Sequence, residues 1–171
     1  MVHHLQFSRM PVSEVRAVAT GGGSDMPDRF SKERERLCPD SASVPRIGVQ
    51  PIDDQHLLLL EHARRFEDSL RRRDASGETA RLFAFLSDYA RFHFEDEEAL
   101  MRSVGYPALE AHARQHAELT ARLRSLEHHF EDEGDSASLI AVLSGLVRRW
   151  LVEHLAGTDQ ELGRFLREHP P

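Results

Sequence analysis

The chain has 171 residues, of which 40% are hydrophobic and 30% charged, and its formal net charge is −7. This composition predicts a water-soluble chain with one hydrophobic core. The acidic balance argues against nucleic acid or an anionic membrane surface as a partner, because both require a basic face. The single cysteine, Cys38, excludes an internal disulfide. No signal-peptide stretch or run of roughly 20 apolar residues is found, so a cytoplasmic location is expected.

Residues 1–45 differ in composition from the remainder of the chain. They are rich in Gly, Ser, Pro and charge, and they lack a sustained apolar period. Such a segment buries too little surface to offset the entropy lost on ordering, so we predict a flexible N-terminal extension. His3 and His4 lie in it and are expected to be solvated. Residues 46–168 are predicted to form one helical domain.

The first two helices are predicted from apolar residues that recur every three or four positions. One helix covers residues 53–73, with Pro51 and an aspartate pair suited to capping its start. The next covers residues 78–104, and Gly105-Tyr106-Pro107 stops it. The inward rows are His56, Leu59, Leu60, Ala63, Phe66 and Leu70 in the first, and Leu82, Leu86, Tyr89, Ala90, His93, Glu97 and Met101 in the second.

The second half of the domain repeats this pattern. Helices are predicted at 108–130 and 137–156, and a break at Gly157-Thr158 leads to a short final helix at 159–167. No segment has the alternation of a strand. Four helices of roughly 20 residues with short connections predict an all-α fold, an antiparallel up-down-up-down four-helix bundle. The inward rows are Leu109, His112, His116, Leu119, Leu123 and Leu126, then Leu139, Leu143, Leu146, Val147, Trp150 and His154.

Each inward row carries polar residues where leucine would be expected. On two helices these residues are four apart and therefore share a face. His154 and Asp159 are five apart, which is out of register on a continuous helix, so the predicted break has to turn Asp159 back toward His154. The set is His56, His93, Glu97, His112, His116, His154 and Asp159.

Burying five imidazoles and two carboxylates without partners is costly, and bound cations remove that cost. Imidazole and carboxylate ligands without thiolate suit iron, zinc or manganese, and seven ligands suit two ions better than one. A single inward histidine is more often a core residue than a ligand. The metal interpretation depends on all four helices supplying inward ligands. The remaining histidines are off these rows and are expected to be solvated: His62, His128, His129 and His169.

Four segments together resemble hemerythrins, in particular the single-domain bacterial ones. They are IDDQH (52–56), HFEDEEALM (93–101), GYPALEAHARQH (105–116) and WLVEHLAGTD (150–159). The resemblance covers residues 46–167. It implies a non-heme di-iron centre (Fe2+/Fe3+) with an oxo or hydroxo bridge, in which His112, His116 and His154 hold one iron, His56 and His93 hold the other, and Glu97 and Asp159 bridge both. The iron with two histidines then has an open position for dioxygen.

The resemblance further implies an apolar oxygen pocket formed by Leu59, Phe94, Trp150, Leu151 and Leu155. The expected function is reversible dioxygen binding for storage, delivery or sensing, and not catalysis. One alternative is a di-iron oxidase, or a scavenger of peroxide or nitric oxide, on the same site. The sequence is also compatible with a signalling module and with a metal-free structural bundle. A protein partner cannot be identified from the sequence.

Overall fold

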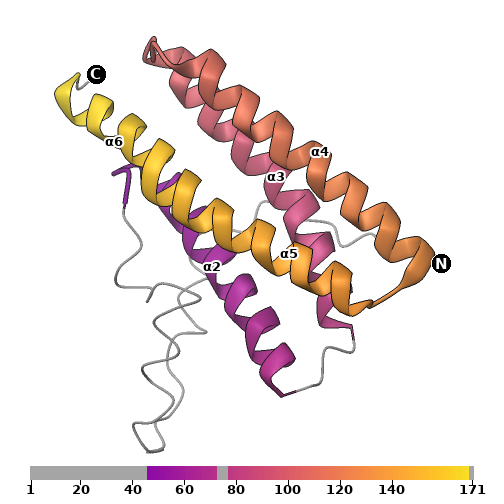
Figure 1. Cartoon of the computed structure of the whole chain (residues 1–171). Coiled ribbons are helices and arrows are strands. Elements are labelled where there is room, and N and C mark those ends of the chain that lie inside the picture. Colours follow the sequence, from indigo (N-terminus) through magenta and orange to yellow (C-terminus); the bar gives the residue numbers. More distant parts are fainter. Residues whose placement is uncertain (1–45, 73–76, 170–171) are drawn as a thin grey trace, which may run out of the picture. The chain divides into compact units, whose positions relative to one another are not determined.

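The computed structural model describes residues 46–72 and 77–169. This part of the chain contains helices and no strand, and it confirms the all-α bundle (Figure 1). The helices are α2 (Gln50–Arg71), α3 (Glu78–Ser103), α4 (Leu109–Glu133), α5 (Ala137–Arg149), the π-helix η3 (Trp150–Thr158) and α6 (Asp159–Glu168). None of the helices described is long and apolar enough to cross a membrane. The predicted extension at 1–45 lies outside the described residues.

The bundle is formed by sequential neighbours. Helix α2 packs on α3, α3 on α4, and α4 on α5. Helices α5, η3 and α6 follow one another without interruption and together form the fourth rod (Figure 1). Short connections produce this arrangement. At the end of α3, Gly105 adopts φ 64°, and the Tyr106 amide donates to the Met101 carbonyl at 2.9 Å. Glycine adopts this left-handed conformation readily because it has no side chain. The predicted end of the helix at Gly105-Tyr106-Pro107 is therefore confirmed.

The predicted capping of the first helix by its aspartate pair is wrong. Helix α2 begins at Gln50, and no side chain caps its start. Asp53 lies one turn inside the helix, where its carboxylate accepts hydrogen bonds from the amides of Ile47 (2.8 Å) and Gly48 (3.2 Å). Asp53 therefore holds the residues that precede α2 in place. Ile47 of this segment packs directly against Gly163 of α6, where a Cβ atom would lie 2.8 Å from the Ile47 Cα atom and would prevent the contact.

The predicted break at Gly157-Thr158 is also wrong. Residues 150–158 remain helical but wind more widely, as a π-helix with hydrogen bonds between residues five apart. Neither Gly157 nor Thr158 interrupts the helix, and a Cβ at Gly157 would meet no atom within 4 Å. The chain thus passes from α5 to α6 without turning. The predicted helix 108–130 in turn extends to Glu133, three residues beyond its expected end.

The buried interior is divided into two apolar clusters. The larger one lies among α2, α3, α4, α5 and η3, and Leu60, Leu82 and Leu143 are among its members. The smaller one consists of Ile47, Ile52, Met101, Tyr106 and Leu162. Among the described residues, ten polar or charged side chains are buried. Seven of them form what we call the polar layer: His56, His93, Glu97, His112, His116, His154 and Asp159.

Candidate metal centre

The π-helix brings His154 and Asp159 onto one face. The Asp159 amide donates to the His154 carbonyl, five residues earlier. Their side chains then meet, with 3.0 Å between His154 Nε2 and Asp159 Oδ1. On an α-helix a spacing of five would point them in different directions, so the wider winding does what the predicted break at Gly157-Thr158 was expected to do.

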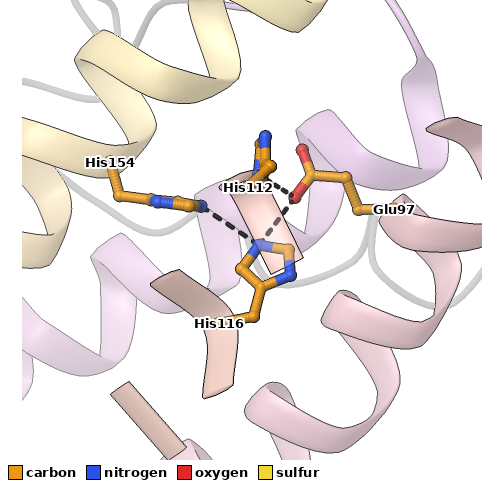
Figure 2. A group of neighbouring side chains, drawn as sticks. All are labelled: Glu97, His112, His116 and His154. Carbon is orange, nitrogen blue, oxygen red and sulfur yellow. Dashed lines mark hydrogen bonds and ion pairs between the residues drawn. The ribbon is translucent and has the colours of Figure 1, made fainter. Parts of the chain in front are cut away.

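One group of candidate ligands consists of Glu97, His112, His116 and His154, whose ligand atoms all lie within 4.8 Å of one another. Figure 2 shows the three imidazoles and the carboxylate directed at a common point. The His116 and His154 Nε2 atoms are 3.1 Å apart. Glu97 Oε2 lies 3.2 Å from Nε2 of both His112 and His116. Helices α3 and α4 and the π-helix contribute to this group.

A second group consists of His56, His93, Glu97 and Asp159, again within 4.8 Å. His56 Nε2 lies 3.3 Å from Asp159 Oδ2, and His93 Nε2 lies 3.8 Å from Glu97 Oε2. Glu97 belongs to both groups. Asp159 directs its other oxygen, Oδ1, at His112 (3.3 Å), a member of the first group. The two carboxylates are therefore the link between the groups.

The polar layer is closed off from solvent. None of its seven side chains is more than 2% exposed. Several of its inward-facing atoms make no hydrogen bond of good geometry within the described part of the chain, including Nε2 of His56, His93 and His112 and both oxygens of Glu97 and Asp159. Buried polar atoms without partners cost on the order of 1–3 kcal/mol each. Imidazole nitrogens and carboxylate oxygens are ligands for divalent cations, so two ions held by these groups would satisfy the atoms that the protein leaves unpaired.

The outer nitrogens of three imidazoles are held by side chains of neighbouring helices. His93 Nδ1 lies 2.9 Å from Gln55 Oε1, and the Gln55 amide donates to Asp96. His116 Nδ1 lies 3.1 Å from Glu98, and His154 Nδ1 lies 3.0 Å from Gln115. A proton on each Nδ1 leaves Nε2 free to bind a cation and fixes the ring. We did not predict these partners, although each is adjacent in sequence to a member of the polar layer.

The electrostatics of the layer also favour positive charge at its centre. Burial lowers the pKa of His93 to about 3. Burial opposes the charged form of His112 as well, but Asp159 and Glu97 outweigh it and raise its pKa to about 9. Burial likewise opposes ionisation of Glu97, and contacts with His112 and His116 hold its pKa well below the usual value. Without metal, therefore, a proton on His112 lies between two carboxylates, where a cation would bind.

The five residues predicted to line a pocket are all buried: Leu59, Phe94, Trp150, Leu151 and Leu155. Phe94 stacks on His116, with ring centroids 3.9 Å apart, and Trp150 stacks on His154 at 3.7 Å. Tyr89, which we predicted only as an inward residue, stacks on His93 at 4.4 Å. Burial and the negative charges of Asp159 and Glu97 raise the Tyr89 pKa well above its ordinary value, so the hydroxyl keeps its proton.

The histidines outside the layer lie away from the centre. His128 and His129 face acidic residues near the end of α4, and His169 is exposed. The prediction that His62 is solvated is wrong, because it is half-buried and stacks on Phe85 with ring centroids 3.7 Å apart. Its helix position was outside the inward row, yet a ring on the neighbouring α3 covers it. His3 and His4 lie outside the described residues.

Known proteins share this domain. A family model described as the Hemerythrin HHE cation binding domain matches residues 47–166. The chain is 33% identical over 134 residues to the bacteriohemerythrin of Stenotrophomonas maltophilia, covering 72% of this chain and 83% of that protein. It is 32% identical to a bacteriohemerythrin of Pseudomonas aeruginosa (66% and 71% covered). It is 27% identical to the myohemerythrin of Theromyzon tessulatum (66% and 81% covered).

No solved structure matches the chain significantly. The family model nevertheless covers nearly all of the bundle described above, from Ile47, which Asp53 holds, to residue 166 in α6. The match includes all seven residues of the polar layer. The chain therefore belongs to the hemerythrin family.

Proposed function

We propose that this protein binds dioxygen reversibly at a pair of iron ions held in the polar layer, for storage, delivery or sensing of oxygen. The observation that carries the proposal is the convergence of two four-residue groups, joined by carboxylates and closed off from solvent, with inward atoms that lack partners. Membership of the hemerythrin family and the similarity to proteins named bacteriohemerythrin support iron as the metal and dioxygen as the ligand.

The residues would divide the work as follows. His112, His116 and His154 would hold one iron, and His56 and His93 the other. Glu97 and Asp159 would bridge the two ions, as their contacts with histidines of both groups suggest. The chemistry that such a pair supplies when bound is a reversible two-electron exchange with dioxygen, together with an oxo or hydroxo bridge between the ions.

The two ions would have unequal numbers of histidine ligands, so they would differ in their capacity to bind a further ligand. Three histidines and the two carboxylates would hold one ion, whereas two histidines and the same carboxylates would hold the other, which would leave it a position for a ligand. Gln55, Glu98 and Gln115 fix ring orientation from outside. The predicted oxygen pocket would exclude water from that position, since its five side chains are apolar or aromatic and buried. Exclusion of water is the property that separates reversible binding from loss of the ligand.

The proposal is tested by metal analysis of the purified full chain and by absorption spectra during repeated oxygenation and deoxygenation. We expect two irons per chain and a visible absorption band that forms with oxygen and disappears when oxygen is removed. His116→Ala should lose iron and the band. His62→Ala is the matched control, because it removes an imidazole from α2 outside the polar layer, and it should keep both. One metal per chain, zinc or manganese in place of iron, or a spectrum indifferent to oxygen would contradict the proposal.

A further inference from the structure

A surface trough runs between α4 and α5, which are neighbours in the bundle (Figure 1). Its volume is about 450 Å³, within the range of sites that bind small molecules. Eight of the described residues line it, and the charged ones among them are Arg122 and Arg149. The other six are small or apolar: Ser125, Leu126, Ala141, Val142, Gly145 and Leu146. The trough therefore combines an apolar surface with two positive charges.

Gly145 keeps the trough open. It lies inside α5, where every residue except proline is more favourable than glycine. Packing does not require it, since a Cβ atom at this position would meet no other atom within 4 Å. A side chain there would occupy part of the trough instead. Glycine thus weakens the helix and leaves space beside Val142, which is 56% exposed and presents apolar surface to that space.

The two arginines lie at one end of the trough. Arg122 is the first residue of α4 to line it and Arg149 is the last residue of α5, and the two helices are antiparallel. Both side chains are exposed, and neither forms an ion pair with a residue that the structure describes. A guanidinium group presents donors in the geometry that a carboxylate accepts. This end of the trough is therefore suited to one carboxylate group.

A second hollow, of about 180 Å³, adjoins the trough at the arginines. Arg122 and Arg149 line both spaces, whereas Glu118, Glu153 and His154 line only the second. The two glutamates would repel an anion that entered the second hollow. An anion bound by the arginines would therefore direct the remainder of the molecule into the apolar trough, away from the metal centre.

We propose that the trough between α4 and α5 binds a free medium-chain fatty acid. Arg122 and Arg149 hold its carboxylate, and its hydrocarbon tail lies along the apolar wall beside Val142. This wall extends over the eight residues from Arg149 back to Ala141, or about 12 Å along the helix axis, which matches an extended chain of about eight carbons. The binding requires neither iron nor oxygen, so it is independent of the proposed function.

Isothermal titration calorimetry of the purified full chain is the test, with sodium octanoate as the probe below the concentration at which it forms micelles. We expect one octanoate to bind per chain. Acetate has the head group without the tail, and octylamine has the tail with a positive head group, so both should bind about tenfold more weakly or worse. Absence of octanoate binding, or equal binding of either comparison compound, would overturn the proposal.

The arginines are tested one at a time. Arg122→Gln and Arg149→Gln each remove one charged donor group, and each should weaken octanoate binding roughly three- to tenfold. Arg148→Gln is the matched control, because Arg148 is exposed on the same helix and lines neither hollow; it should leave the affinity unchanged. Equal weakening in all three variants would indicate non-specific attraction between charges and would overturn the proposal.

Gly145→Leu tests the trough itself without a risk of unfolding. Leucine is a better helix former than glycine, so the variant should unfold at the same or a higher urea concentration. Its side chain would fill the space that the tail occupies, and octanoate binding should fall about tenfold or more, while the iron content stays the same. A folded Gly145→Leu variant that binds octanoate as the unsubstituted chain does would overturn the proposal.

Two further measurements distinguish a free fatty acid from larger occupants. The chain, with its net charge of −7, should not sediment with phosphatidylglycerol vesicles, because like charges repel. Sedimentation velocity should give the same mass with and without octanoate. Sedimentation with vesicles that requires Arg122 and Arg149 would indicate a membrane surface as the occupant, and a dimer that octanoate dissociates would indicate a second copy of the chain. Either result would overturn the proposal.

Discussion

The π-helix leads to a specific prediction about the spacing of His154 and Asp159. An α-helix turns about 100° per residue, so five residues carry a side chain about 140° away from the starting direction. The wider winding of η3 brings the two side chains back to one face, with 3.0 Å between His154 Nε2 and Asp159 Oδ1. Ala156 lies between them and is exposed. Deleting it would shorten the spacing to four, which an ordinary α-helix brings to within about 40° of one face.

We therefore expect opposite results from deletion and insertion at this point. Without Ala156 the segment should revert to an α-helix, and Asp159 and the following α6 should keep their directions. One alanine inserted after Ala156 makes the spacing six, so the aspartate would lie about 120° away from His154. The same rotation would expose Leu162, which is fully buried, at a cost of about 1.5–3 kcal/mol.

The assay is iron content per chain together with urea unfolding followed by circular dichroism. The deletion variant should retain two irons and most of its stability. The insertion variant should lose iron and unfold at lower urea. A deletion variant that folds yet binds no iron would refute this reasoning, because it would mean that the wide winding itself, and not the common face that it creates, is what the centre requires.

Two further predictions concern stability. Asp53→Ala should lower the free energy of unfolding by roughly 3 kcal/mol in urea titrations, since it leaves two amides without a charged acceptor; Asp53→Asn should cost about half as much, and Asp54→Ala should change little. In metal-free protein, stability should be greatest near pH 6.5 and fall on both sides. The pKa of buried His93 is about 3, so between pH 6.5 and 3 the unfolded chain binds a proton at this residue and the native state does not. The free energy of unfolding therefore falls as the pH drops below 6.5. The pKa of His112, about 9, means that the stabilisation from its proton is complete below pH 6.5 and is lost as the pH rises through 9. A urea midpoint that does not change with pH would contradict both assignments.

The helices and the polar layer could be predicted from spacing, because inward rows are a property of one helix at a time. His93 with Glu97 and His112 with His116 are four apart, and the structure brings each pair to the centre. The approach of Asp159 to His154 was expected, but from a chain break; the π-helix that brings them together was missed, since a period of 3.6 residues carries no sign of a local π-helix. Gly157 suggested a break, yet it is helical and does not use the backbone conformations that only glycine allows.

Side-chain contacts between helices could not be predicted from the sequence. Gln115 bonds His154 on the neighbouring rod, and its own neighbour His116 is bonded by Glu98 of α3. Which side chain meets which ring depends on how far each helix is rotated and shifted against the next, and packing decides that. The half-buried position of His62 has the same origin, since the ring of Phe85 on α3 covers it.

The division of the interior into two apolar clusters has a consequence for how the bundle melts. The smaller cluster joins Ile47, which precedes α2, to Tyr106 and to Leu162 of α6. Rings of the polar layer contact both clusters, since His112 lies against Tyr106 of the smaller one and His116 against Phe94 of the larger one. Coupling between the two clusters therefore passes in part through the polar layer. Ions held across the layer would bind ligands from every rod at once and act as a cross-link between them. Metal content would then set cooperativity: the loaded chain would unfold as one unit, and amide hydrogen exchange in α6 would accelerate first when the ions are removed.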